Sequence, residues 1–155
     1  MTNIVWKRPD GGVSVTHLTP ASLAEGNTPE QEALRLKERG DIPREYELAA
    51  VHAQIPQDRS FRDAWHYDGE NVGIDMGQAR DIHKNRLREK RKGLFAALDA
   101  EYMKADEMGD TAKKQAVAAK KQALRDITQH PEIEAAATPA ALKTAAISAF
   151  GANGA

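Results

Sequence analysis

Residues 94–127, LFAALDAEYMKADEMGDTAKKQAVAAKKQALRDI, decide the fold, because two helix-forming stretches meet there at a short break. Ala, Leu, Glu, Lys and Gln dominate both stretches, and these residue types favour helices. Gly109-Asp110-Thr111 interrupts the pattern. A connection this short is typical of antiparallel neighbouring helices. The stretch therefore predicts a helical hairpin.

Outward from the break, we expect the first helix to span about residues 76–108 and the second about residues 111–129. The second helix carries small apolar residues at helical spacing, and we expect this stripe to face the first helix. Its members are Ala112, Ala116, Ala119, Ala123 and Ile127. We also expect the acidic end of the first helix to pair with the basic start of the second.

The chain after the hairpin contains two proline signals. We expect Pro131 to end the second helix, because proline removes a backbone donor. Thr138 followed by Pro139 is typical of a helix start, which predicts a short helix over residues 140–150.

The N-terminal residues predict a β-hairpin. Ile4–Arg8 and Val13–His17 flank Pro9-Asp10-Gly11-Gly12, a sequence rich in turn-forming residues. Val13 and Val15 alternate with polar residues, which places both valines on one face. Further strands are predicted at residues 46–53, 61–67 and 72–74.

A short helix is expected between these strands. Thr28 and Gln31 form a capping-box pattern around Pro29, and Gly40 fits the residue after the helix end. Leu34 is its expected core anchor.

These elements predict an α+β fold in three parts. Residues 1–74 form a small β-hairpin or sheet with one short helix. Residues 75–150 form the long antiparallel helical hairpin and a short C-terminal helix, and residues 151–155 form a mobile tail.

Composition excludes several functional classes. The chain has 155 residues and no cysteine, which excludes disulfides, thiol nucleophiles and cysteine-ligated zinc. A formal net charge of −1 argues against a globally basic nucleic-acid binder. No apolar stretch approaches the roughly 18 residues of a membrane span, and we expect no signal peptide. The histidines, serines and glycines form no recognised catalytic, metal or phosphate-binding pattern, so we expect no enzyme, cofactor or metal.

The first candidate partner-binding feature is a basic run within residues 80–92. The basic face of such a helix is either exposed to solvent or docks on an acidic protein surface. Contact with nucleic acid is the lesser alternative. Its candidate binding residues are Arg80, Lys84, Arg86, Arg88 and Arg91.

The second candidate is the segment Phe61-Arg62-Asp63-Ala64-Trp65. Large aromatic rings are unfavourable to expose in a chain with only 5% aromatic residues, so we favour a core role for Phe61 and Trp65. Trp and Arg are also typical interface anchors, which makes Phe61, Arg62 and Trp65 candidate partner-binding residues.

Several segments resemble a poorly characterised family of tailed-phage structural or tail proteins. They are FRDAW at residues 61–65, DMGQARDIHKNRLR at 75–88, ALDAEYMKADE at 97–107 and KQALRDIT at 121–128. The resemblance covers roughly residues 59–145 and implies a non-enzymatic virion protein of the tail or head–tail region. Such a protein is made in the host cytoplasm and contacts other phage structural proteins in several copies per particle.

A partial resemblance concerns KQALRDIT alone, which is similar to a stretch near the end of tail-fibre assembly chaperones. It implies an alternative function, a chaperone absent from the mature particle. The chain departs from that pattern because it has no aromatic residue between Tyr102 and Phe150 and no following Trp-Pro.

Overall fold

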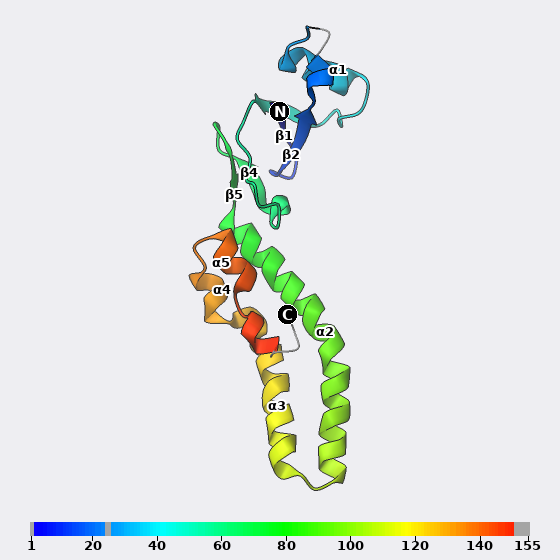
Figure 1. Ribbon diagram of the computed structural model, residues 1–155, viewed down its shortest axis with the longest axis vertical. Coiled ribbons are helices and arrows are strands. Elements are labelled where there is room, and N and C mark those ends of the chain that lie inside the picture. Colours follow the sequence, from blue (N-terminus) through cyan, green and yellow to red (C-terminus); the bar gives the residue numbers. More distant parts are fainter. Residues whose placement is uncertain (1, 24–25, 151–155) are drawn as a thin grey trace. The chain divides into compact units, whose positions relative to one another are not determined.

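A computed structural model describes residues 2–23 and 26–150 of the chain, which forms two compact units, Met1–Asp75 and Met76–Ala155. The first contains a small antiparallel sheet and the second a helical hairpin, so the predicted α+β class is confirmed (Figure 1). The expected mobile tail at residues 151–155 lies outside the described residues.

The sheet of the first unit has the strand order β2-β1-β3, and all neighbours are antiparallel. Its strands are β1 (Thr2–Lys7), β2 (Val13–Leu18) and β3 (Glu47–Val51). A separate hairpin joins β4 (Trp65–Tyr67) to β5 (Val72–Ile74). The strand predicted at residues 61–67 is shorter in the structure, because Arg62–Ala64 form a 3₁₀ turn. A further 3₁₀ turn, Pro20–Leu23, follows β2.

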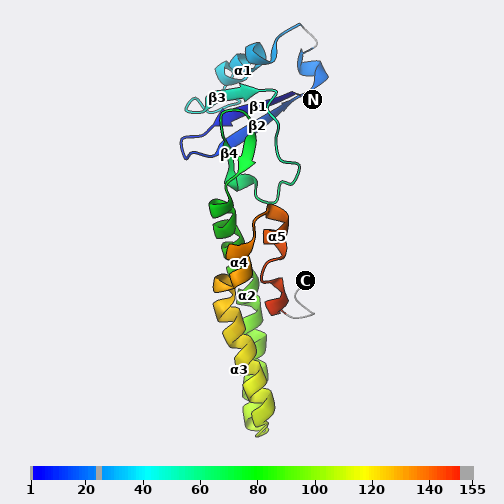
Figure 2. The same cartoon turned by 90° about the vertical axis from the view of Figure 1, so that its left-hand side faces the viewer.

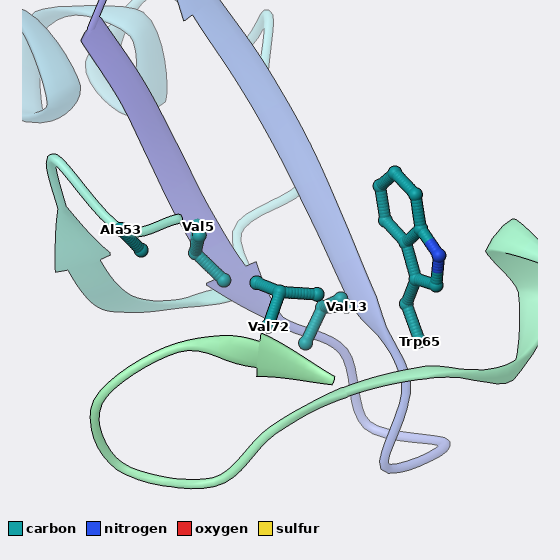
Figure 3. Packing of buried hydrophobic residues seen from close by; sticks show 5 residues of the cluster. All are labelled: Val5, Val13, Ala53, Trp65 and Val72. Carbon is teal, nitrogen blue, oxygen red and sulfur yellow. The ribbon is translucent and has the colours of Figure 1, made fainter. Parts of the chain in front are cut away.

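Both faces of the three-stranded sheet are covered. Ile4 and Trp6 of β1 point to one face and pack with Ala33 of α1 (Pro29–Glu38). Val5 points to the opposite face, where it packs with residues of the β4–β5 hairpin (Figures 2 and 3). Successive strand residues alternate in direction, so a strand covered on both sides is continuously apolar.

Helix α1 begins and ends as predicted. Thr28 accepts from the backbone N–H of Gln31, and the Gln31 side chain accepts from the backbone N–H of Thr28. At the other end Gly40 has φ +85°, and the N–H of Asp41 reaches the carbonyl of Leu36 to complete a Schellman motif. The expectation for Leu34 is wrong: it is 60% exposed, because the helix turns the small Ala33 toward the sheet.

The hairpin of the second unit consists of α2 (Met76–Glu107) and α3 (Thr111–Asp126), with Asp110 as the N-cap of α3. The expected charge pairing is present as Lys114–Asp106 and Lys121–Asp99. The predicted seam is wrong for its alanines, since Ala112, Ala116, Ala119 and Ala123 are exposed, whereas Ile127 is buried as predicted. Val117 and Leu124 are the buried residues of α3, because the larger side chains remove more apolar surface from water.

The C-terminal segments lie beside the first half of α2. After a 3₁₀ turn at Ile127–Gln129 come α4 (Pro131–Ala135), α5 (Pro139–Thr144) and a 3₁₀ turn at Ile147–Phe150. Pro131 therefore begins a helix rather than only ending one. The predicted 140–150 helix is interrupted at Ala146, which has φ +62° and donates its N–H to Glu132.

Candidate functional site

The aromatic segment at residues 61–65 belongs largely to the interior. Phe61 is 1% exposed and Trp65 is 5% exposed, as the core interpretation predicts. Phe61 is therefore not available as a surface anchor in this structure. Arg62, between the two rings, is exposed.

Arg62 and Trp65 line a small pocket of about 60 Å³ in the first unit, which we call the arginine pocket. Its walls come from the turn after β1, from β2, from the loop before the 3₁₀ turn, from that turn itself and from the start of β4. The lining residues are Arg8, Val13, Ser14, Val15, His17, Arg59, Arg62, Asp63 and Trp65. Three guanidinium groups in one small pocket attract anions.

A chain of hydrogen bonds holds the ring of His17 at this pocket. Asn3 donates its amide N–H to the carbonyl of Ala53 at 3.2 Å, so its Oδ1 accepts from Nδ1 of His17 at 2.8 Å. Nε2 of His17 is 2.7 Å from a terminal nitrogen of Arg59, which can only donate. His17 therefore links Asn3 to Arg59 and holds Arg59 in place.

Arg8 is held by the β1–β2 turn. Its Nε donates to Asp10 at 3.0 Å, and the same carboxylate accepts from the backbone N–H of Gly12 at 3.0 Å. The Gly12 hydrogen bond, followed by the one from Arg8, holds the pKa of Asp10 below its usual range. A Cβ at Gly12 would meet the guanidinium of Arg8, so a larger residue there would make the flexible Arg8 side chain shift.

The indole nitrogen of Trp65 is a buried donor without a hydrogen-bond partner among the described residues. The other tryptophan differs: Nε1 of Trp6 donates to Oγ1 of Thr16 at 3.0 Å. In Figure 3 the nitrogen-bearing edge of Trp65 is turned away from Val5 and Val72 of the same cluster. Buried polar groups are nearly always paired, so this donor needs an explanation.

The basic run on α2 is divided by the fold. Arg80 donates to the carbonyls of Ile133 and Ala136 at the C-terminal end of α4. Arg91 donates to the carbonyls of Leu124 and Arg125 in the last turn of α3. Cations at helix C-termini satisfy carbonyls that lack helical partners. Both arginines, predicted as partner-binding, therefore hold the second unit together.

Lys84 is also used internally, since it lies 2.7 Å from Glu134 of α4. Arg86 and Arg88 are exposed, and Arg88 donates to Asn85 at 2.6 Å. The basic residues of α2 thus do not form one continuous phosphate-binding face. Arg86 and Arg88 remain candidates for contact with a partner.

The far end of the hairpin exposes large apolar side chains. Met103 is 58% exposed and Met108 is 72% exposed. Tyr102, next to Met103 in the sequence, has two ammonium groups over its ring, those of Lys114 and Lys121, each 5.3 Å from the ring centre. A hollow of about 260 Å³ at this end is lined by Tyr102, Ala105, Asp106, Gly109, Asp110, Thr111, Lys114, Gln115 and Ala118.

Across residues 2–23 and 26–150, no group of three or more His, Asp or Glu side chains is placed to hold a metal ion. None of the helices in these residues combines the length and apolar character needed to cross a bilayer. Comparisons with protein-family models, curated proteins and solved structures found no match for the chain.

Proposed function

We propose that this chain is a non-enzymatic structural component of a tailed-phage virion, in the tail or head–tail region, and that it acts through protein–protein contacts. The resemblance of residues 59–145 to phage tail proteins supports the phage assignment. Several copies per particle and a larger structural protein as the partner follow from the same resemblance.

The observation that carries the contact role is the outer half of the α2–α3 hairpin. Here the two helices lie side by side without α4 or α5 beside them (Figures 1 and 2). The packing between the two helices leaves apolar surface accessible, since Leu94, Leu98 and Tyr102 of α2 are only partly buried. Elements of secondary structure become stable by burying an apolar face against another element. A partner that packs on this arm completes that burial.

The exposed methionines are consistent with such a partner. Met is flexible and polarisable, and it is frequent on protein-binding surfaces. Met103 and Met108 both lie at the end of the arm. The proposed contact surface is therefore the end of the hairpin, residues 102–118.

Quantitative mass spectrometry of purified particles of a phage that encodes this chain tests the proposal. Peptides of the chain in a fixed ratio to known structural proteins are the expected result. Absence from particles, with abundant chain in the infected cell, contradicts the virion role and favours the tail-fibre assembly chaperone. Coexpression with a fibre protein then separates the two functions, because a chaperone raises the yield of soluble fibre.

A further inference from the structure

We infer that the arginine pocket binds a carboxylate group supplied by an acidic segment of a partner protein. The inference rests on the proposed function, since it identifies the chemistry of one protein contact. It concerns the first unit alone and is independent of the hairpin surface.

The charge of the pocket favours an anion. Arg59 and Arg62 have no acidic partner within ion-pair distance among the described residues, and Arg59 is held by the ring of His17. Asp63 also lines the pocket, and Arg8 is paired with Asp10. The balance is three guanidinium groups against two carboxylates, which leaves an excess of positive charge.

The indole of Trp65 is a second feature of the pocket, and it is independent of the charge of the arginines. Trp65 lines the same pocket, and its buried donor has no partner among the described residues. A carboxylate has two acceptor oxygens and accepts from several donors at once. Trp65 lines the pocket, so a carboxylate held by the guanidinium groups there changes the surroundings of the indole ring.

The size of the pocket favours a small anionic group. Its volume of about 60 Å³ has room for the head of an Asp or Glu side chain. Planar carboxylates match the fork of donors on arginine.

The chain has two tryptophans, which gives the test an internal control. The full chain is labelled with ¹⁵N, and both indole N–H signals are followed by NMR. The Trp65 signal is identified by its loss in Trp65→Phe or by its ring contacts. The probe is a short peptide containing Glu, compared with the same peptide containing Gln, at constant ionic strength. The Trp65 signal is expected to move saturably with the Glu peptide, whereas the Trp6 signal stays in place.

Two arginine variants then locate the binding. Arg62→Gln is expected to weaken the peptide at least fivefold. Arg44→Gln, an exposed arginine of the same unit outside the pocket, is expected to leave the affinity unchanged. Equal shifts of both indoles, no saturable shift, or equal affinities in the two variants overturn the inference.

Other ligands test the choice of partner. Inorganic phosphate or duplex DNA that moves the Trp65 signal at lower concentration than the Glu peptide overturns the carboxylate assignment. If the chain is stoichiometric in particles but does not bind the Glu peptide, the inferred carboxylate site is rejected and the proposed function stands. If the chain binds the Glu peptide specifically but is absent from particles, the virion role is rejected and the inferred carboxylate site stands.

Discussion

The guanidinium of Arg59 donates to Nε2 of His17 at 2.7 Å and so joins residues 42 positions apart in the sequence. The bond connects the loop before the 62–64 turn to β2. Because the opposite nitrogen of His17 is committed to Asn3, the contact positions Arg59 at the arginine pocket.

A double-mutant cycle measures this contact. His17→Phe and Arg59→Met are each expected to destabilise the first unit, with a coupling free energy of roughly 0.5–1.5 kcal/mol. Urea denaturation followed by tryptophan fluorescence reports this unit, since Trp6 and Trp65 both lie in it. Additive effects of the two substitutions would show that the bond contributes nothing to stability.

Substitution by alanine is expected to have opposite effects on stability at two glycines. Gly93 lies within α2 with open space around its Cα, so Gly93→Ala is expected to stabilise the second unit by ~1 kcal/mol. Gly40 has φ +85°, so Gly40→Ala is expected to destabilise the first unit by about 1–2 kcal/mol. Hydrogen exchange of the amides in α2 and in the sheet measures both. Effects of the same sign contradict the assigned backbone conformations.

Much of the fold was predictable because its signals are local. The capping box at Thr28, the break at Gly109 and the β-hairpin around Gly11 each depend on neighbours within a few residues. The helix faces were harder. The alanine stripe of α3 has helical spacing, yet Val117 and Leu124 are also separated by two turns and bury more surface. Spacing alone did not choose between these faces.

Arg91 is expected to stabilise the second unit rather than bind a partner. Arg91→Met removes the donor that reaches the carbonyls of Leu124 and Arg125, so we expect a loss of about 1–3 kcal/mol. Arg88→Met, an exposed neighbour, is expected to change stability by less than about 0.5 kcal/mol. Amide exchange in the last turn of α3 distinguishes the two. Equal effects of Arg91→Met and Arg88→Met on stability would contradict the structural role of Arg91.

The site was less predictable than the fold. The sequence indicated Arg62 and Trp65, but Arg8, His17 and Arg59 come from separate segments and join them only through the folding of the sheet. No local pattern marks such a set. Conversely, the basic run within residues 80–92 looked continuous, and its division followed from α4 and the end of α3 docking on one side of α2.

The Lys84–Glu134 pair predicts a pH dependence. The hydrogen bond from Lys84, followed by its charge, lowers the pKa of Glu134. A carboxyl whose pKa is lowered by folding stabilises the fold above its ordinary value of about 4.3. That contribution is lost as the pH falls through the lowered pKa. Lys84→Met is therefore expected to raise the pKa of Glu134.

NMR titration of the side-chain carboxyl carbon of Glu134 checks this shift. Lys92→Met is the matched control, because Lys92 pairs with Glu89 on the exposed side of the same helix. The control is expected to leave the pKa of Glu134 in place. A similar titration curve in the wild type and in Lys84→Met contradicts the ion pair.

Cross-linking mass spectrometry of intact, purified phage particles tests whether the chain is a virion protein that contacts another protein through the end of its hairpin. Lys104 and Lys113 are exposed near the end of the hairpin, within reach of a partner that packs on the arm. We expect the chain to be present and these lysines to cross-link to a different virion protein. Absence of the chain from the particles, or cross-links confined to the chain itself, would contradict this expectation.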